Sequence, residues 1–176
     1  MKKVTERRNQ IMLQKIQLRN AVEQVLHVPG NYRGGILEMT IVFDCNLSKQ
    51  TSAETAKELA NALKQQNELF RNVRLNTIQW RNDDELIKEI TPMVHLQMGT
   101  YFNSYEQFET EKTLEILTGQ LKKFYARSKL IIALTDGKYT VQEPEILEES
   151  LKPFLGKKLI LVKVDEESGK TCVFRI

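Results

Sequence analysis

An apolar segment that ends in an acid is the feature that most constrains this chain. Residues 36–43 are predominantly apolar, and Asp44, Asn46 and Ser48 follow them at alternate positions. A helix is predicted to begin close behind, near Thr51, where a Thr-x-x-Glu spacing has the form of a capping box. We therefore expect a buried strand whose carboxyl end carries three oxygen-bearing side chains. Open α/β sheets place their ligand sites at that end.

A second apolar run, over residues 129–135, also ends in an acid, Asp136, followed by Gly137. Such runs are typical of strands that are buried on both faces of a parallel sheet. Between and after the two runs, hydrophobic periodicity predicts alternating helices and strands. The helices are expected over residues 53–66, 106–127 and 145–154, and the other strands over 73–80, 158–164 and 171–175. This alternation predicts an α/β fold, a Rossmann-like three-layer sandwich with a mostly parallel central sheet and helices on both faces.

The segment between the two acid-terminated runs has weaker signals. Residues 73–80 alternate apolar and polar side chains, which predicts a half-exposed strand near a sheet edge. Residues 82–85 have turn chemistry and are expected to lead into a short helical piece. Residues 94–96, preceded by Pro92, are expected to form another short strand.

Composition indicates an ordinary globular protein in one main domain. The chain has 176 residues, of which 41% are hydrophobic and 28% are charged. It contains no apolar run long enough to span a membrane and no secretory signal pattern, so a cytoplasmic location is expected. Two cysteines without metal-type spacing fit that reducing compartment.

The net charge of +3 is unevenly distributed. Residues 1–30 carry six Lys and Arg against two Glu, whereas the rest carries 20 basic and 21 acidic residues. We expect an N-terminal basic helix within residues 1–30, mainly over 5–27, and an α/β domain over residues 31–176. A basic arm of this kind can contact nucleic acid, although no aromatic side chains are interleaved with its charges for stacking.

Parallel strands end at one edge of a sheet, so the two terminal acids are expected to lie close together. The Gly99-Thr100 pair is predicted to lie in a loop that could fold over the same edge. The candidate metal ligands are Asp44, Asn46, Ser48, Thr100 and Asp136. All five offer oxygen, and none offers sulfur or imidazole. This donor set favours Mg²⁺, or Mn²⁺ or Ca²⁺, over zinc.

Over about residues 36–165 the sequence resembles the von Willebrand factor A domain, also called the integrin I-like domain. The family's Asp-x-Ser-x-Ser motif corresponds to the segment from Asp44 to Ser48, in which Asn46 replaces the first Ser. Its Thr element corresponds to Thr100 after Gly99, and its Asp-Gly element to Asp136-Gly137. The resemblance implies a near-complete metal-ion-dependent adhesion site, in which the bound cation coordinates an acidic residue of a partner.

The function expected from this resemblance is that of a non-enzymatic, intracellular protein-binding or adaptor module, with an AAA+ ATPase as one possible partner class. A metal-free scaffold that docks a partner or nucleic acid through the basic N-terminal helix is the alternative. A third hypothesis is a Mg²⁺-dependent phosphohydrolase resembling the haloacid dehalogenase class. That chemistry needs a second Asp two residues after the nucleophile as general acid, and Asn46 cannot serve as one.

Overall fold

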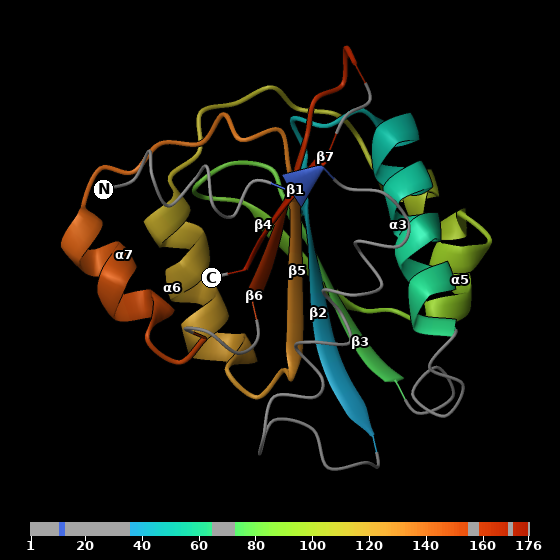
Figure 1. The fold of residues 1–176 in the computed structure, drawn as a ribbon, viewed down its shortest axis with the longest axis horizontal. Coiled ribbons are helices and arrows are strands. Elements are labelled where there is room, and N and C mark those ends of the chain that lie inside the picture. The colour runs from blue at the N-terminus through green and yellow to red at the C-terminus, as the bar shows by residue number, and fades with distance from the viewer. Residues whose placement is uncertain (1–10, 13–35, 65–72, 155–158, 169–170, 176) are drawn as a thin grey trace.

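The computed structural model describes residues 11–12, 36–64, 73–154, 159–168 and 171–175. They form an α/β fold around one mixed β-sheet (Figure 1). The sheet order is β1-β7-β6-β5-β2-β3-β4. The expected α/β class and the parallel centre of the sheet are therefore confirmed.

Four parallel strands form the centre of the sheet, and antiparallel strands flank them on both sides. The central strands are β2 (Leu37–Asp44), β3 (Val73–Trp80), β5 (Leu130–Thr135) and β6 (Leu159–Val164). The flanking strands are β4 (Leu86–Ile90) on one side, and β7 (Thr171–Arg175) with β1 (Ile11–Met12) on the other. The predicted strands over 36–43, 129–135, 158–164 and 171–175 are confirmed to within a few residues at their ends.

Helices cover both faces of the sheet, which gives three layers (Figure 1). Helices α3 (Lys49–Lys64) and α5 (Met93–Gln97) lie on one face, together with the 3₁₀ helix η1 (Thr100–Ser104). Helices α6 (Leu114–Tyr125) and α7 (Pro144–Leu151) lie on the other. Two buried apolar clusters result, one on each side of the sheet. Burial on both faces is the physical reason that β2 and β5 are largely apolar.

Helix α3 begins three residues earlier than the capping-box spacing predicted. The Ser48 hydroxyl accepts the backbone N–H of Thr51 at 3.1 Å, so Ser48 is the capping residue. Glu54 does not return to the start of the helix; its carboxylate accepts a hydrogen bond from the Gln50 side chain at 3.2 Å. The capping signal was therefore real, but its first residue was Ser48 rather than Thr51.

Three predictions in the middle of the chain are wrong. Residues 75–80 of β3 are buried rather than half-exposed, because β4 pairs with β3 and lies outside it. The short helical piece expected after residues 82–85 is the strand β4, because the Asn82 side chain accepts the N–H of Asp84 in a tight turn that brings the chain back along β3. The strand expected over residues 94–96 is helix α5, which begins directly after Pro92.

The helix predicted over residues 106–127 is shorter than expected. Only residues 114–125 are helical, as α6. Residues 105–113, named here the crossing segment, have no regular helix; they pass over the carboxyl ends of the central strands. The crossing segment supplies most of the contacts at the candidate site described below.

The expected N-terminal helix falls almost wholly outside the described residues. The exception is residues 11–12, which form β1 and pair antiparallel with β7. The prediction of a helix is therefore wrong at these two positions, which pair with β7 instead.

Candidate functional site

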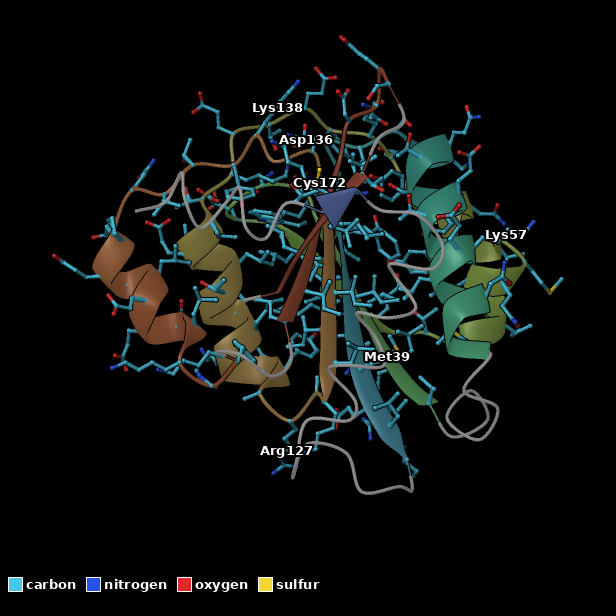
Figure 2. The ribbon with its side chains drawn as sticks, in the orientation of Figure 1. Met39, Lys57, Arg127, Asp136, Lys138 and Cys172 are labelled. Carbon is cyan, nitrogen blue, oxygen red and sulfur yellow. The ribbon has the colours of Figure 1, made fainter. Side chains whose placement is uncertain are left out.

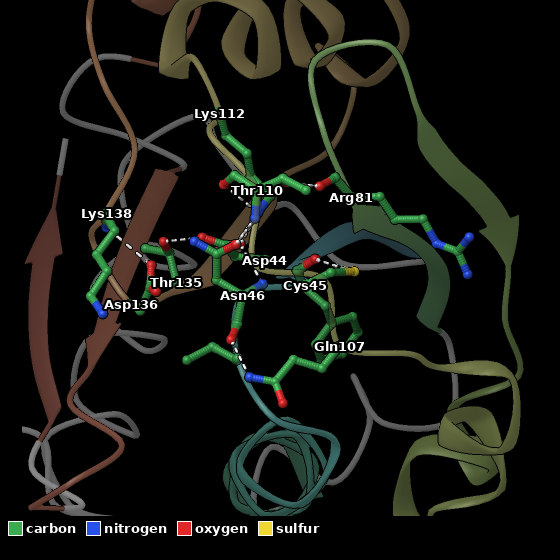
Figure 3. Close-up of polar contacts among 12 residues, drawn as sticks. Asp44, Cys45, Asn46, Arg81, Gln107, Thr110, Lys112, Thr135, Asp136 and Lys138 are labelled. Carbon is green, nitrogen blue, oxygen red and sulfur yellow. Dashed lines mark hydrogen bonds and ion pairs between the residues drawn. The ribbon is translucent and has the colours of Figure 1, made fainter.

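The site is built around Asp44, the last residue of β2. Its carboxylate Oδ1 lies 3.0 Å from the Nζ atom of Lys112, which belongs to the crossing segment. The exposed fraction of the side chain is 0% for Asp44 and 1% for Lys112. Figure 3 shows the two side chains pointing toward each other above the end of the strand. The site therefore contains a fully buried ion pair between residues 68 positions apart in the chain.

Both carboxylate oxygens of Asp44 have further partners. Oδ1 accepts the backbone N–H of Asn46 at 2.9 Å, and Oδ2 accepts the hydroxyl of Thr135 at 2.6 Å. Burial raises the pKa of Asp44 above its ordinary value, while the Thr135 hydroxyl, the Asn46 amide and the Lys112 ammonium act in the opposite direction. The network thus offsets part of the cost of placing a carboxylate in the protein interior.

The ammonium group of Lys112 is also saturated. It donates to Oδ1 of Asn46 and to the carbonyl oxygen of Thr110, in addition to its contact with Asp44. An ammonium has three protons, and three oxygens surround this one. The indole ring of Trp80 lies on a further side, with its centroid 5.9 Å from Nζ. The positive charge is therefore held by a small shell of oxygens and one aromatic face.

The crossing segment is hydrogen-bonded along the loop that follows β2. The Tyr105 hydroxyl donates to the carbonyl of Leu47 at 2.7 Å, and the Phe108 amide donates to the carbonyl of Cys45 at 2.7 Å. The Gln107 side chain donates to the Asn46 carbonyl at 2.8 Å. These bonds place the crossing segment directly over the carboxyl end of β2 (Figure 3).

Of the five predicted ligands, the structure brings Asp44 and Asn46 together. Both side chains present an oxygen to Lys112. Asn46 also accepts the backbone N–H of Thr110 at 3.0 Å, so its amide oxygen binds the crossing segment twice. The proximity of these two residues follows from the alternate spacing that the sequence showed.

The other three predicted ligands are engaged elsewhere. The Ser48 hydroxyl caps α3. Thr100 is exposed, and its hydroxyl donates to the carbonyl of His95 at 3.5 Å. Asp136 accepts the backbone N–H of Lys138 at 3.0 Å. It lies at the carboxyl edge of the sheet, and Arg127 marks the opposite edge (Figure 2). The residue of β5 that reaches Asp44 is Thr135, the neighbour of Asp136.

Sequence reasoning missed Lys112 and Thr135. Thr135 had a usable signal, because side chains alternate along a strand and the last residue of β5 and the next one must point in different directions. Gly137 marks that turn, since its φ of +81° is a backbone conformation that residues with a Cβ rarely adopt. Lys112 had no local signal, because it was placed inside a predicted helix.

The donors at this site do not fit the divalent cation that the family resemblance implied. Among the predicted ligands, Asp44 is the one carboxylate that contacts the Lys112 ammonium, whereas Asp136 bonds to the Lys138 amide. Lys112 therefore already supplies a positive charge where a cation would bind. A divalent ion beside that ammonium would add two positive charges to a site with one negative charge. Within the described residues, no group of three or more His, Cys, Asp or Glu side chains could hold a metal ion.

Comparisons with known proteins identify no family. No protein-family model matches the chain. No curated protein matches it either. Among the described residues, no helix is both long and apolar enough to cross a membrane.

Cys45 provides a natural probe of this site. Its thiol is buried next to Asp44, and burial together with the nearby carboxylate raises the pKa of the thiol to about 12. Because the thiolate is the reactive form, we expect Cys45 of the native protein to resist iodoacetamide at neutral and mildly alkaline pH. The measurement is mass spectrometry of the Cys45 peptide in a Cys172→Ser background, with urea-unfolded protein as the control. Equal rates of alkylation in the native and unfolded protein would contradict this burial.

Proposed function

We propose that this chain is a non-enzymatic protein-binding module with a von Willebrand A-like architecture, and that it binds its partner without a bound metal. The observation that carries the proposal is a pair of exposed apolar side chains at helix α5, close in the chain to β4, which is the edge strand of the sheet among the described residues. Val94 in helix α5 and Met98, the C-cap residue directly after it, have exposed fractions of 46% and 71%. Ile90, at the end of strand β4, is also 66% exposed, but it lies on the opposite face of the sheet, the face on which Lys88 contacts α6.

Within the described part of the chain, β4 is the last strand on this side of the sheet, and it presents unpaired backbone groups. The Arg81 amide bonds to Glu85 and the Thr91 amide bonds to Leu75, which fixes the hydrogen-bonded positions of the β3–β4 ladder at odd-numbered residues of β4. The backbone N–H and C=O groups of Leu86, Lys88 and Ile90 therefore point away from β3. Exposed apolar side chains next to an open strand edge are typical of protein-binding surfaces.

The geometry of Asp44 supports a binding function over the phosphohydrolase alternative. A nucleophilic aspartate must reach its substrate, whereas both oxygens of Asp44 are buried and hydrogen-bonded within the protein. Docking through the basic residues 1–30 stays a prediction, since these residues lie outside the described part of the chain apart from β1.

The proposal is tested by photo-crosslinking in cells. Benzoylphenylalanine is placed at Met98, and in a separate variant at Ile146, which is 49% exposed on α7. Because α5 and α7 lie on opposite faces of the sheet (Figure 1), Ile146 is a matched exposed apolar control. We expect a discrete product of higher mass from position 98 and none from position 146. The same products from both positions, or none from either, would contradict a docking surface at α5.

A further inference from the structure

We propose that the Lys112 ammonium is the permanent internal cation of this site, and that it takes the place of the divalent ion in holding the strand-end oxygens together. The proposal concerns the chain's own residues and does not depend on which partner the α5 surface binds. In a metal site the loops bind a free cation. Here the positive charge is itself a side chain of the crossing segment.

The charge count supports a monovalent cation. Asp44 contributes one negative charge, and Lys112 contributes one positive charge at 3.0 Å from it. The other groups around Nζ are neutral oxygens from Asn46 and Thr110. One carboxylate does not neutralise a divalent ion, and the second terminal acid, Asp136, accepts the Lys138 amide instead. The Asp44–Lys112 pair therefore has no net charge, and no further cation is needed to neutralise it.

Tethering gives this cation a mechanical consequence. Lys112 lies near the end of the crossing segment, two residues before α6 begins, and its side chain contacts Asp44 at the end of β2. In the same region, the Thr110 amide donates to the side-chain oxygen of Asn46, and the Gln107 side chain donates to the backbone carbonyl of Asn46. The ion pair therefore holds residues 105–113 over the carboxyl edge, where a partner's carboxylate would have to approach a metal. Binding of an acidic partner residue at Asp44 is excluded by the same contacts.

The first test uses the unmodified protein. Thermal unfolding is followed in EDTA and then in millimolar MgCl₂ or MnCl₂. We expect the same Tm in all three conditions, because Asp44 and Asn46 are bonded to Lys112 and the other three predicted ligands are engaged elsewhere. A saturable rise of Tm with Mn²⁺ that Asp44→Ala abolishes would overturn the proposal, since it would show that metal displaces the ammonium.

The second test uses matched lysine variants. Lys112→Met keeps the length of the side chain and removes its charge, and Lys138→Met makes the same change at an exposed lysine of the same edge. Hydrogen exchange of the Phe108 and Thr110 amides reports on the crossing segment, since both bond to the loop after β2. We expect exchange to accelerate at least about tenfold in Lys112→Met and to stay unchanged in Lys138→Met. Unchanged exchange in a folded Lys112→Met protein would overturn the proposal.

A double variant covers the case in which Lys112→Met does not fold. Asp44→Asn/Lys112→Met removes both charges, so neither partner is left buried and uncompensated. We expect the double variant to fold and its Tm to exceed that of Asp44→Asn. A Tm below that of Asp44→Asn, or a double variant that does not fold, would show independent contributions and would overturn the proposal. A failure here would leave the crosslinking result at Met98 unaffected, so the docking surface at α5 and the role of Lys112 are tested separately.

Discussion

Asp44→Asn is expected to lower the free energy of unfolding by about 3–5 kcal/mol, which is the usual cost of breaking a buried ion pair by removing one partner. The amide has nearly the shape of the carboxylate, so the substitution changes charge with little change in volume. It leaves the Lys112 ammonium, which is 1% exposed, without its counter-charge. Domains of this size are stable by about 5–15 kcal/mol, so the loss is a large part of the total. Urea unfolding followed by circular dichroism measures it.

The matched control is Asp136→Asn. Sequence reasoning treated Asp44 and Asp136 as equivalent, because each ends an apolar strand. In the structure Asp136 is partly exposed, and its described hydrogen bond comes from the Lys138 amide, which an Asn side chain also accepts. We therefore expect a change within about 0.5 kcal/mol. Equal losses from the two substitutions would contradict the asymmetry between these acids.

Phe102→Ala is expected to cost about 3–5 kcal/mol of unfolding free energy, the usual range for deleting a buried Phe side chain. Phe102 lies in η1 with no exposed surface. Its ring packs edge-on against Phe43 of β2 at 5.2 Å between centroids, and against Tyr101 at 5.0 Å. Tyr105, which packs against the same ring at 5.8 Å, binds the loop after β2. The cavity would therefore weaken the start of the crossing segment as well as the core.

Phe124→Ala is the control for that prediction. Phe124 is 53% exposed at the end of α6, where the ammonium of Lys88 lies 4.0 Å from its ring centroid. Loss of that exposed contact is expected to cost less than about 1 kcal/mol. Equilibrium denaturation of both variants makes the comparison, and a Phe102→Ala loss no larger than that of Phe124→Ala would show that the aromatic cluster is not tightly packed.

The fold was predictable from sequence wherever local pattern and tertiary burial agree. Strands β2 and β5 are buried on both faces, so their composition alone identifies them. Most errors lie in residues 73–98. Strand β3 was expected to be half-exposed, a short helical piece was expected where β4 lies, and a strand was expected where α5 lies. Polar residues of β3 such as Thr77 and Gln79 are buried through pairing with β4 and through contacts with Thr91 and Tyr101. Those neighbours are not visible in a local alternation of apolar and polar residues.

The candidate site likewise has a part that the sequence determined and a part that only the tertiary structure decided. Asp44 and Asn46 lie two residues apart after one strand, so the sequence by itself determined that a carboxylate and an amide oxygen would share the carboxyl edge of the sheet. Only the tertiary structure decided what they bind. Thr135 comes from a neighbouring strand and Lys112 from the crossing segment, and both reach Asp44 through long-range packing. Oxygen ligands specify a positive charge without specifying its source, because an ammonium and a metal ion satisfy the same lone pairs.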